Sequence, residues 1–375
     1  MEKRFYIIVG EASGDLHASN LIREIKKADK SIVFRGFGGD KMQQAGAQIV
    51  RHYRELAFMG FWEVLTNLHT ISRNLRYCKE DIAAFRPHAV ILVDYPGFNM
   101  RMARYLRKMR IPCFYYISPK VWAWNISRVK KIKEWVDHMF VILPFEKDFY
   151  QKYGYRVDFV GHPLLDALSA YTQNENFFIQ NNLEQKRIIA LLPGSRRQEI
   201  QRMLPVMLRM VHHFPGYQFV VAGLSHIGAP FYQSYIHHPN VKLVIDQTYD
   251  LLSHSFAALV TSGTATLETA LFDVPQVVCY CANFISYVIG YFVIQVQFIS
   301  LVNLICGKQV VTELIQYDLN ESNLRKALQA ILENKTRERI FADYRLLREK
   351  LGQPGASQRA ASLILHYFNQ LPQRD

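Results

Sequence analysis

The feature that most constrains the fold is an alternation of short apolar runs with amphipathic stretches. Six runs in the first half are rich in β-branched and aromatic residues and have the length of buried strands. They are Phe5–Val9, Ile32–Gly36, Ala89–Val93, Cys113–Ile117, Met139–Leu143 and Val157–Val160. Between them, apolar residues recur at helical spacing in 19–28, 61–85, 100–109 and 128–136. This order predicts six strand–helix units around a parallel sheet.

The same alternation restarts after a polar, amide-rich segment at residues 171–182, which suits a linker. Five further strands are predicted at Ile188–Leu192, Gln218–Ala222, Val241–Ile245, Ala257–Thr261 and Gln276–Tyr280. Helical stretches follow at 321–334, 336–350 and 356–369. A chain of 375 residues exceeds what one core usually organises. We therefore predict two doubly wound α/β domains, at 1–170 and 185–350, with a helix in 355–375 that crosses back to the first domain.

The net charge limits the classes of molecule that the protein is expected to bind. The sequence has 45 Lys+Arg against 32 Asp+Glu, a net charge of +13, which favours a partner carrying phosphate: a nucleotide, a nucleic acid or an anionic lipid. Five cysteines without a C-x-x-C pair predict free thiols in a reducing cytosol. The apolar run near the N-terminus is too short for a signal peptide. These features favour a cytoplasmic location.

Ligands of parallel sheets bind beyond the carboxyl ends of the strands, so the loops there are examined first. Gly10–Asp15 offers backbone N–H groups, but its two acidic residues would repel a pyrophosphate and favour sugar hydroxyls. A capped turn without a ligand is the alternative. Asp94 ends an all-apolar strand before Pro-Gly, and an ionised carboxylate there can take a proton from a hydroxyl. A structural cap of the next helix is its alternative.

Two loops of the second half resemble anion sites. In Leu192–Glu199 a glycine allows close backbone approach, and Arg196 can pair with phosphate. Thr261–Glu268 opens a helix with a small, hydroxyl-rich first turn, which suits an anion. Glu268 can accept hydrogen bonds from ribose, or it can simply cap the helix.

Several catalytic motifs are absent from the sequence. It contains no P-loop, H-E-x-x-H, D-x-D or G-x-S-x-G pattern. We therefore predict neither a metal site nor a cofactor, and serine-hydrolase chemistry is not favoured.

Eight ordered motifs together resemble the lipid-A-disaccharide synthase family, and they span nearly the whole chain. They are Gly10–Asp15, Met59–Leu65, Asp94–Asn99, Tyr116–Trp124, Leu143–Glu146, Val160–Pro163, Leu192–Glu199 and Thr261–Leu271. The resemblance implies the two-domain GT-B fold, with two Rossmann-like domains facing a cleft. It also implies an inverting glycosyltransferase of lipid A and lipopolysaccharide biosynthesis in a Gram-negative bacterium.

The implied reaction moves 2,3-diacylglucosamine from UDP-2,3-diacylglucosamine to the 6-hydroxyl of 2,3-diacylglucosamine 1-phosphate, forming a β-1,6 linkage. Asp94 is then the implied general base. The implied donor-site residues are Gly194, Ser195, Arg196, Ser262, Gly263, Thr264, Ala265, Thr266, Glu268, Asn303 and Gln316. The implied acceptor-side residues are Glu11, Ser13, Gly14, Asp15, His17, Met59 and Asn99. His17 and His162 lie beside the implied cleft, but a lone histidine is more often a hydrogen-bonded structural residue than a catalytic one.

The chain departs from the family pattern in its second half. Val302 and Thr312 stand where the family usually has proline, which puts the geometry of the donor loop in question. Residues 283–298 also lack the basic residues common there in the family. A membrane contact at that place is accordingly in doubt.

A membrane contact is predicted from two regions. The stretch from Val274 to Gly307 has no charged residue or histidine, and its part at 283–307 can be buried, interfacial or membrane-inserted. The helix from Phe61 carries an apolar stripe of Trp62, Leu65, Leu68 and Ile71, for which core packing is the alternative. Basic clusters at 101–110 and 128–133 suit anionic headgroups or the acceptor phosphate. We predict a peripheral protein on the inner face of the inner membrane.

Two other functions remain as alternatives. A UDP-sugar 2-epimerase shares the fold but acts on one soluble nucleotide sugar. A basic nucleic-acid-binding protein would use the net charge, but it leaves the loops after the strands unexplained, so no nucleic-acid partner is predicted. A homo-oligomer is compatible with the sequence.

Overall fold

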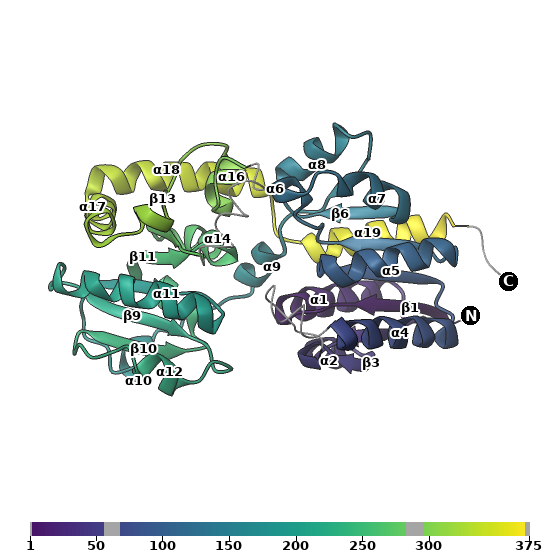
Figure 1. Ribbon diagram of the computed structural model, residues 1–375, viewed down its shortest axis with the longest axis horizontal. Coiled ribbons are helices and arrows are strands. Elements are labelled where there is room, and N and C mark those ends of the chain that lie inside the picture. Colours follow the sequence, from purple (N-terminus) through teal and green to yellow (C-terminus); the bar gives the residue numbers. More distant parts are fainter. Residues whose placement is uncertain (1, 56–67, 283–295, 372–375) are drawn as a thin grey trace. The chain divides into compact units, whose positions relative to one another are not determined.

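The computed structural model describes residues 2–55, 68–282 and 296–371, and the chain divides into two compact units (Figure 1). Unit 1 comprises residues 1–169 together with 352–375, and unit 2 comprises residues 170–351. The last helix of the chain therefore belongs to the same unit as the first strand, although more than 340 residues separate them.

Unit 1 is built on a seven-stranded parallel sheet with the order β3-β2-β1-β4-β5-β6-β7. Its strands are β1 Lys3–Ile8, β2 Ile32–Gly38, β3 Ala47–His52, β4 Ala89–Val93, β5 Cys113–Tyr116, β6 His138–Val141 and β7 Asp158–Phe159. Its helices are α1 Ala12–Ala28, α2 Asp40–Gln44, α4 Leu68–Phe85, α5 Pro96–Lys108, α6 Val121–Trp124, α7 Arg128–Trp135, α8 Pro144–Gln151, α9 Pro163–Ser169 and α19 Ala356–Asn369.

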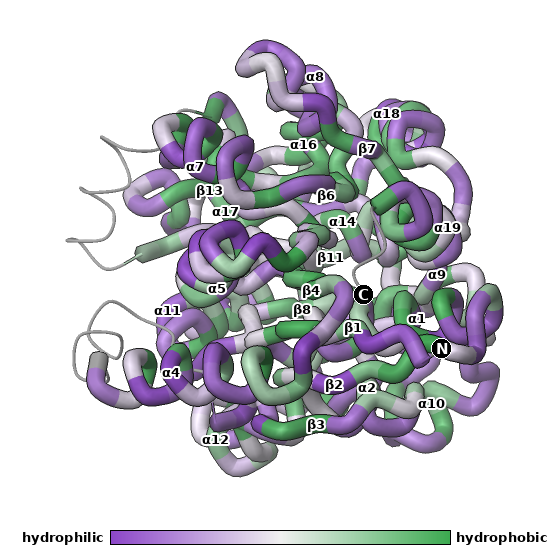
Figure 2. Tube along the Cα trace, turned by 90° about the vertical axis from the view of Figure 1, so that its right-hand side faces the viewer, coloured by the Kyte–Doolittle hydropathy of each residue, from purple (hydrophilic) through white to green (hydrophobic). Residues whose placement is uncertain are grey.

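Both faces of this sheet are covered, which explains why its central strands are apolar at every position. Successive side chains of a strand point to opposite faces. Phe5 and Ile7 of β1 accordingly pack with α1 and α19, whereas Tyr6 and Ile8 pack with α4, α5 and α7. All four are fully buried. Figure 2 shows the result as a green strand β4 and mainly purple outer helices such as α7.

Unit 2 repeats the plan with a six-stranded parallel sheet in the order β10-β9-β8-β11-β12-β13. Its strands are β8 Ile188–Leu192, β9 Gln218–Gly223, β10 Val241–Ile245, β11 Ser255–Thr261, β12 Gln276–Tyr280 and β13 Thr312–Ile315. Its helices are α10 Phe177–Gln180, α11 Arg197–Leu208, α12 Ala229–Gln233, α13 Thr248–Ser253, α14 Thr264–Leu271, α16 Leu301–Cys306, α17 Glu321–Leu332 and α18 Asn334–Leu351. One face of the sheet packs on α10 and α13.

Two strands were missing from the sequence prediction. The six predicted strands of unit 1 are joined by β3, and the five of unit 2 are joined by β13. Both lie at an edge of their sheet, and most of their side chains are only half-buried. An edge strand of mixed polarity has no continuous apolar run, so the criterion used for the others cannot detect it. The helix after β1 also begins earlier than predicted, at Ala12 rather than at Ser19.

The return of α19 to unit 1 is fixed by a single carboxylate. Asp166, on α9, accepts hydrogen bonds from the backbone N–H groups of Gly355 (2.5 Å), Ala356 (3.1 Å) and Ser357 (3.1 Å). These are N–H groups at the start of a helix, which have no acceptor inside it. Arg359, one turn further on, donates to the carbonyl of Val160 at 2.8 Å. The two ends of unit 1's chain are therefore joined by side chains as well as by packing.

Candidate active site

In unit 1 the loops that follow β1, β4 and β5 lie at one edge of the sheet, because these neighbouring strands are parallel. Asp94 follows β4, and its N–H donates to the carbonyl of Tyr116, the last residue of β5, at 3.1 Å. Gly10 lies after β1, and a Cβ at this position would stand 2.3 Å from the ring of Tyr95. The structure thus brings the Gly10–Asp15 loop and the loop that carries Asp94 together.

The turn that carries Asp94 has a strained backbone. Asp94 and Tyr95 both adopt positive φ angles, of 45° and 49°. Asp tolerates this region, but a bulky residue such as tyrosine rarely occupies it. Asn99, which is fully buried, holds the turn by directing its Nδ2 to the carbonyls of Asp94 (2.8 Å) and Val93 (3.2 Å). Strain that the surroundings enforce in this way is a common mark of a functional site.

These bonds involve the backbone of Asp94 and leave its carboxylate available for chemistry. Tyr115 donates its hydroxyl to the Asp94 carbonyl at 2.6 Å, so this main-chain group is satisfied. Burial raises the pKa of the Asp94 carboxyl, while the positive charge of Lys120 and the Tyr95 backbone N–H oppose the rise. A general base works best when its pKa lies near the working pH. Burial therefore shifts the pKa of Asp94 in the direction that suits a general base, and Asn99 holds the turn that carries it.

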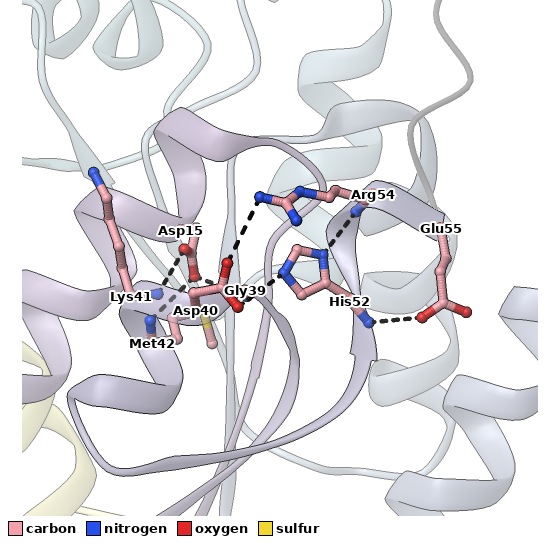
Figure 3. Close-up of polar contacts among 8 residues, drawn as sticks. All are labelled: Asp15, Gly39, Asp40, Lys41, Met42, His52, Arg54 and Glu55. Carbon is pink, nitrogen blue, oxygen red and sulfur yellow. Dashed lines mark hydrogen bonds and ion pairs between the residues drawn. The ribbon is translucent and has the colours of Figure 1, made fainter. Parts of the chain in front are cut away.

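Asp15 has a different role from the sugar contact that the sequence suggested. Its carboxylate is buried and accepts from the N–H groups of Gly39 (2.8 Å), Lys41 (3.0 Å) and Met42 (3.2 Å), as Figure 3 shows. It therefore caps α2 from the first turn of α1. Of the same motif, Gly14 is buried, Glu11 is half-buried and Ser13 is exposed. Glu11 and Ser13 remain the members that can face a ligand.

Asp40, the first residue of α2, connects this helix to the end of β3 and the residues after it (Figure 3). Asp40 lies 3.6 Å from the His52 Nε2 and 3.7 Å from the Arg54 guanidinium, and the His52 N–H donates to Glu55. The residues that follow, including the predicted Met59, Trp62 and Leu65, lie outside the described residues, as does the side chain of Leu68. Ile71, on α4, is half-buried.

Two histidines lie in the same unit and are held neutral by burial. Burial lowers the pKa of His17 to about 4, and the nearby Lys41 lowers it further, against the effect of Asp166. Burial lowers the pKa of His162 to about 3, with His17 and Lys120 acting in the same direction. The Nδ1 of His162 also accepts the Leu164 N–H at 3.2 Å, which requires an unprotonated nitrogen. These contacts fit the structural alternative for His162.

We expect this pair to make unit 1 sensitive to acid. The unfolded chain takes up protons on both histidines near pH 6.5, whereas the folded chain does so only near pH 4 and 3. The two histidines therefore leave the free energy of unfolding undiminished above pH 6.5, and they lower it as the pH drops toward 4. Thermal denaturation at pH 7 and pH 5 measures this effect. Between these two pH values the Tm should fall less for His162→Asn than for the wild type, because asparagine keeps a hydrogen-bond acceptor and does not titrate. Equal losses in the two proteins would contradict this assignment.

The loop after β5 is held by a buried glutamate that sequence reasoning did not single out. Glu146, at the start of α8, is 1% exposed. Its carboxylate accepts from the Ser118 hydroxyl at 2.5 Å, the Trp122 indole N–H at 3.0 Å and the Leu143 N–H at 3.0 Å. Burial raises the pKa of Glu146, and these donors oppose that rise. The motif that contains Glu146 was visible in the sequence, but its long-range partners were not.

In unit 2, the loop after β8 is shaped by Gly194, whose φ is +113°. A Cβ there would lie within 2.8 Å of the Glu199 side chain. The Glu199 carboxylate accepts from the Ser195 N–H at 3.1 Å and pairs with the Arg196 guanidinium at 3.2 Å. Arg196 has 56% of its side chain exposed, and an exposed pair of this kind contributes little stability. The guanidinium can therefore exchange this partner for a phosphate.

The loop after β11, which was predicted to bind an anion, leads into α14. Gly263 and Thr264 are exposed, and nothing lies within 4 Å of where a Gly263 Cβ would be. Thr266 directs its hydroxyl to the Gly263 carbonyl at 2.8 Å, which keeps the first turn compact. Ala265 is half-buried between them. The first N–H groups of a helix lack internal acceptors and favour an anion.

Glu268 lies one turn inside α14 and is half-buried. Burial raises the pKa of its carboxyl, and a hydrogen bond from the Tyr249 hydroxyl, at 3.4 Å, opposes this. Ser262 has its hydroxyl on the carbonyl of Ile299 at 3.0 Å and so connects the loop after β11 to the residues before α16. Glu268 keeps the capacity to accept further hydrogen bonds from a ligand's hydroxyls.

Asn303 and Gln316, which were predicted to contact the donor, support the loop instead. Asn303 is fully buried; its amide donates to Val311 O and Glu313 and accepts from the N–H groups of Val310 and Val311. The Gln316 amide makes two hydrogen bonds to the backbone of Ala282, at 3.0 and 3.2 Å. Both amides are thus used within the protein. Glu313 completes the support by accepting the N–H groups of residues 299 and 300.

Comparisons with known proteins decide the family. A family model described as lipid-A-disaccharide synthetase matches residues 5–367. The lipid-A-disaccharide synthase of Syntrophus aciditrophicus is 40% identical over 372 residues, covering 97% of each chain. The chain belongs to the lipid-A-disaccharide synthase family. Membership confirms the resemblance drawn from the eight motifs and makes the chain a glycosyltransferase of lipid A disaccharide formation.

Solved structures identify the fold of this lipid-A-disaccharide synthase family member. A UDP-GlcNAc 2-epimerase from Neisseria meningitidis, bound to UDP-GlcNAc, matches 99% of this chain and 100% of its own, with a TM-score of 0.69 and 13% identity. The calicheamicin glycosyltransferase CalG4 matches with a TM-score of 0.62 and 16% identity over 99% and 100% of the two chains. The predicted GT-B fold is confirmed. At these identities the likeness concerns the fold alone.

Proposed function

We propose that the protein transfers 2,3-diacylglucosamine from UDP-2,3-diacylglucosamine to the 6-hydroxyl of 2,3-diacylglucosamine 1-phosphate, giving the β-1,6 disaccharide and UDP. Family membership supports the product class. The observation that carries the mechanism is Asp94, a carboxylate held in a strained turn by the buried Asn99. Unit 1 would then be the acceptor domain and unit 2 the donor domain.

The chemistry requires one displacement. Asp94 takes the proton from the acceptor 6-hydroxyl as its oxygen forms a bond to the anomeric carbon of the donor. The bond from that carbon to the UDP oxygen breaks, and the configuration inverts. The negative charge that develops on UDP is met by the N–H groups at the start of α14 and by Arg196. This route uses no covalent nucleophile, and we propose that it needs no bound metal.

The donor site would be the surface formed by the loops after β8 and β11. Gly194, Ser195 and Arg196 would bind the phosphates, together with the first turn of α14. Glu268 would accept hydrogen bonds from the ribose. A protein of the same fold is bound to UDP-GlcNAc, which supports a UDP-sugar as the ligand of this one.

The acyl chains of both substrates favour a membrane location, and the charge of unit 1 supports one. Residues 101–110 and 128–137 carry nine Lys or Arg and two acidic residues, so they supply seven of the 13 net positive charges. These residues lie on and just after α5 and α7, which pack together through Arg104 and Trp135. No helix among residues 2–55, 68–282 and 296–371 is long and apolar enough to span a bilayer. We propose peripheral binding to the anionic inner face of the inner membrane.

An acceptor-dependence assay tests the transfer against the epimerase alternative. Purified protein is incubated with UDP-2,3-diacylglucosamine, with and without the acceptor, in the presence of a chelator, and UDP is measured. We expect UDP only when the acceptor is added. A parallel incubation with UDP-GlcNAc alone, followed by NMR, should show no 2-epimer. Acceptor-independent release or epimer formation would contradict the proposal.

A further inference from the structure

Lys120 stands in the loop between β5 and α6, beside the loop that carries Asp94. The two strands that lead into these loops are paired in register, Val93 with Tyr116. The Asp94 N–H and carbonyl both bond to β5, through the Tyr116 carbonyl and the Tyr115 hydroxyl. The side chain of Lys120 is exposed.

The loop around Lys120 is clamped on both sides. Ser118, two residues before it, and Trp122, two residues after it, donate to the same buried carboxylate of Glu146. Tyr150 adds a hydrogen bond to the carbonyl of Pro119 at 3.4 Å. Ile117, where the loop begins, has a φ of +65°, which is rare for a β-branched residue. A flexible surface loop would need neither the clamp nor the strain.

We propose that Lys120 is the cation that keeps Asp94 ionised, with Glu146 fixing the loop that presents it. Lys120 acts through Asp94, so it is a positioning residue and not a catalytic one. The proposal rests on the proposed role of Asp94 as general base.

The charged groups around Asp94 agree with this assignment. Burial raises the pKa of Asp94, and the charge of Lys120 is the side-chain effect that opposes it. Besides burial, Glu11, from the loop after β1, raises the pKa of the Tyr95 hydroxyl, and Arg101, on α5, lowers it. His162, after β7, is a neutral neighbour of Lys120. Lys120 is therefore the charge whose removal should change the ionisation of Asp94.

The test is the pH profile of kcat/KM for Lys120→Met, since this profile reports the ionisation of the free enzyme. Without the cation the pKa of Asp94 rises, so the acidic limb should move upward. A close opposite charge shifts a carboxyl by about 1–3 units, and because solvent screens an exposed lysine, the limb should move by less than this. The kcat/KM of Lys120→Met should therefore be reduced at low pH and should reach the wild-type value at higher pH.

Two controls make the result specific. Lys120→Arg keeps the charge and should retain the wild-type limb. Lys147→Met removes an exposed cation from α8 of the same unit and should leave the limb in place. Substrate ionisation is identical in all arms. An unshifted limb in Lys120→Met would overturn the inference, and so would a higher KM without a shift, which would instead make Lys120 an anion ligand of the substrate.

The proposed function and this inference can fail separately. If Asp94→Asn retains turnover, the general base is wrong and the role of Lys120 fails with it. If Asp94→Asn is inactive and Lys120→Met shows an unshifted limb, only the inference about Lys120 is overturned.

Discussion

Asp94→Asn should lower kcat by about two to four orders of magnitude, the usual contribution of a general base. Asparagine has the same shape and also tolerates a positive φ, so the turn held by Asn99 should persist. What is lost is the acceptor for the proton of the attacking hydroxyl. The measurement is steady-state disaccharide formation at saturating donor and acceptor.

UDP binding provides the control for this variant. Because the proposed UDP site lies on the loops after β8 and β11, in the other unit, calorimetric titration of Asp94→Asn with UDP should give the wild-type affinity. Asp148→Asn, at an exposed position on α8, removes a carboxylate from the same unit and should retain full turnover. Equal losses of turnover and UDP affinity in Asp94→Asn would remove the base assignment.

Asp166→Ala should lower the free energy of unfolding of unit 1 by about 2–3 kcal/mol, since one carboxylate there serves three N–H groups at the start of α19. The negative charge also suits the positive end of the helix. For a domain of this size the Tm should fall by about 5–10 °C. Calorimetric or circular-dichroism melting of the purified variant measures the change.

Two further variants separate capping from a general loss of charge. Asp166→Asn keeps one acceptor oxygen and should lose less stability than alanine does. Asp148→Ala, on the surface of the same unit, should melt like the wild type. If Asp166→Ala also melts like the wild type, α19 is held by its packing and its other hydrogen bonds, such as that from Arg359, and the carboxylate does not contribute as the geometry indicates.

The sequence predicted the strands and loops that depend on burial. The strands from β1 to β12 that lie inside the sheets are apolar because helices cover both faces, and this leaves a clear pattern. The loops were selected as candidate ligand sites because each comes directly after a predicted strand. They are the loops at Gly10, Asp94, Gly194 and Gly263. β3 and β13 escaped prediction because they are edge strands of mixed polarity; the edge strands β7 and β10 were predicted because their segments are more apolar.

The roles of individual polar residues were harder to predict, because their partners lie far along the chain and no sequence motif shows them. Asp15 bonds to residues 24 to 27 positions away, and Gln316 bonds to Ala282, 34 positions away. Glu146 reaches 28 positions back to Ser118. Such contacts arise only when strands are placed beside one another. Motif letters alone therefore could not distinguish a ligand contact from a residue that supports one.

The central claim is that this chain joins two acylated glucosamines through a β-1,6 linkage. Its most direct test is the lipid product of an incubation with UDP-2,3-diacylglucosamine and 2,3-diacylglucosamine 1-phosphate, characterised by mass and by NMR. We predict a disaccharide 1-phosphate whose anomeric proton shows the β configuration and whose linkage is to C6. Two results would contradict the account. One is a folded protein that binds UDP but forms no disaccharide, and the other is a disaccharide product linked in the α configuration.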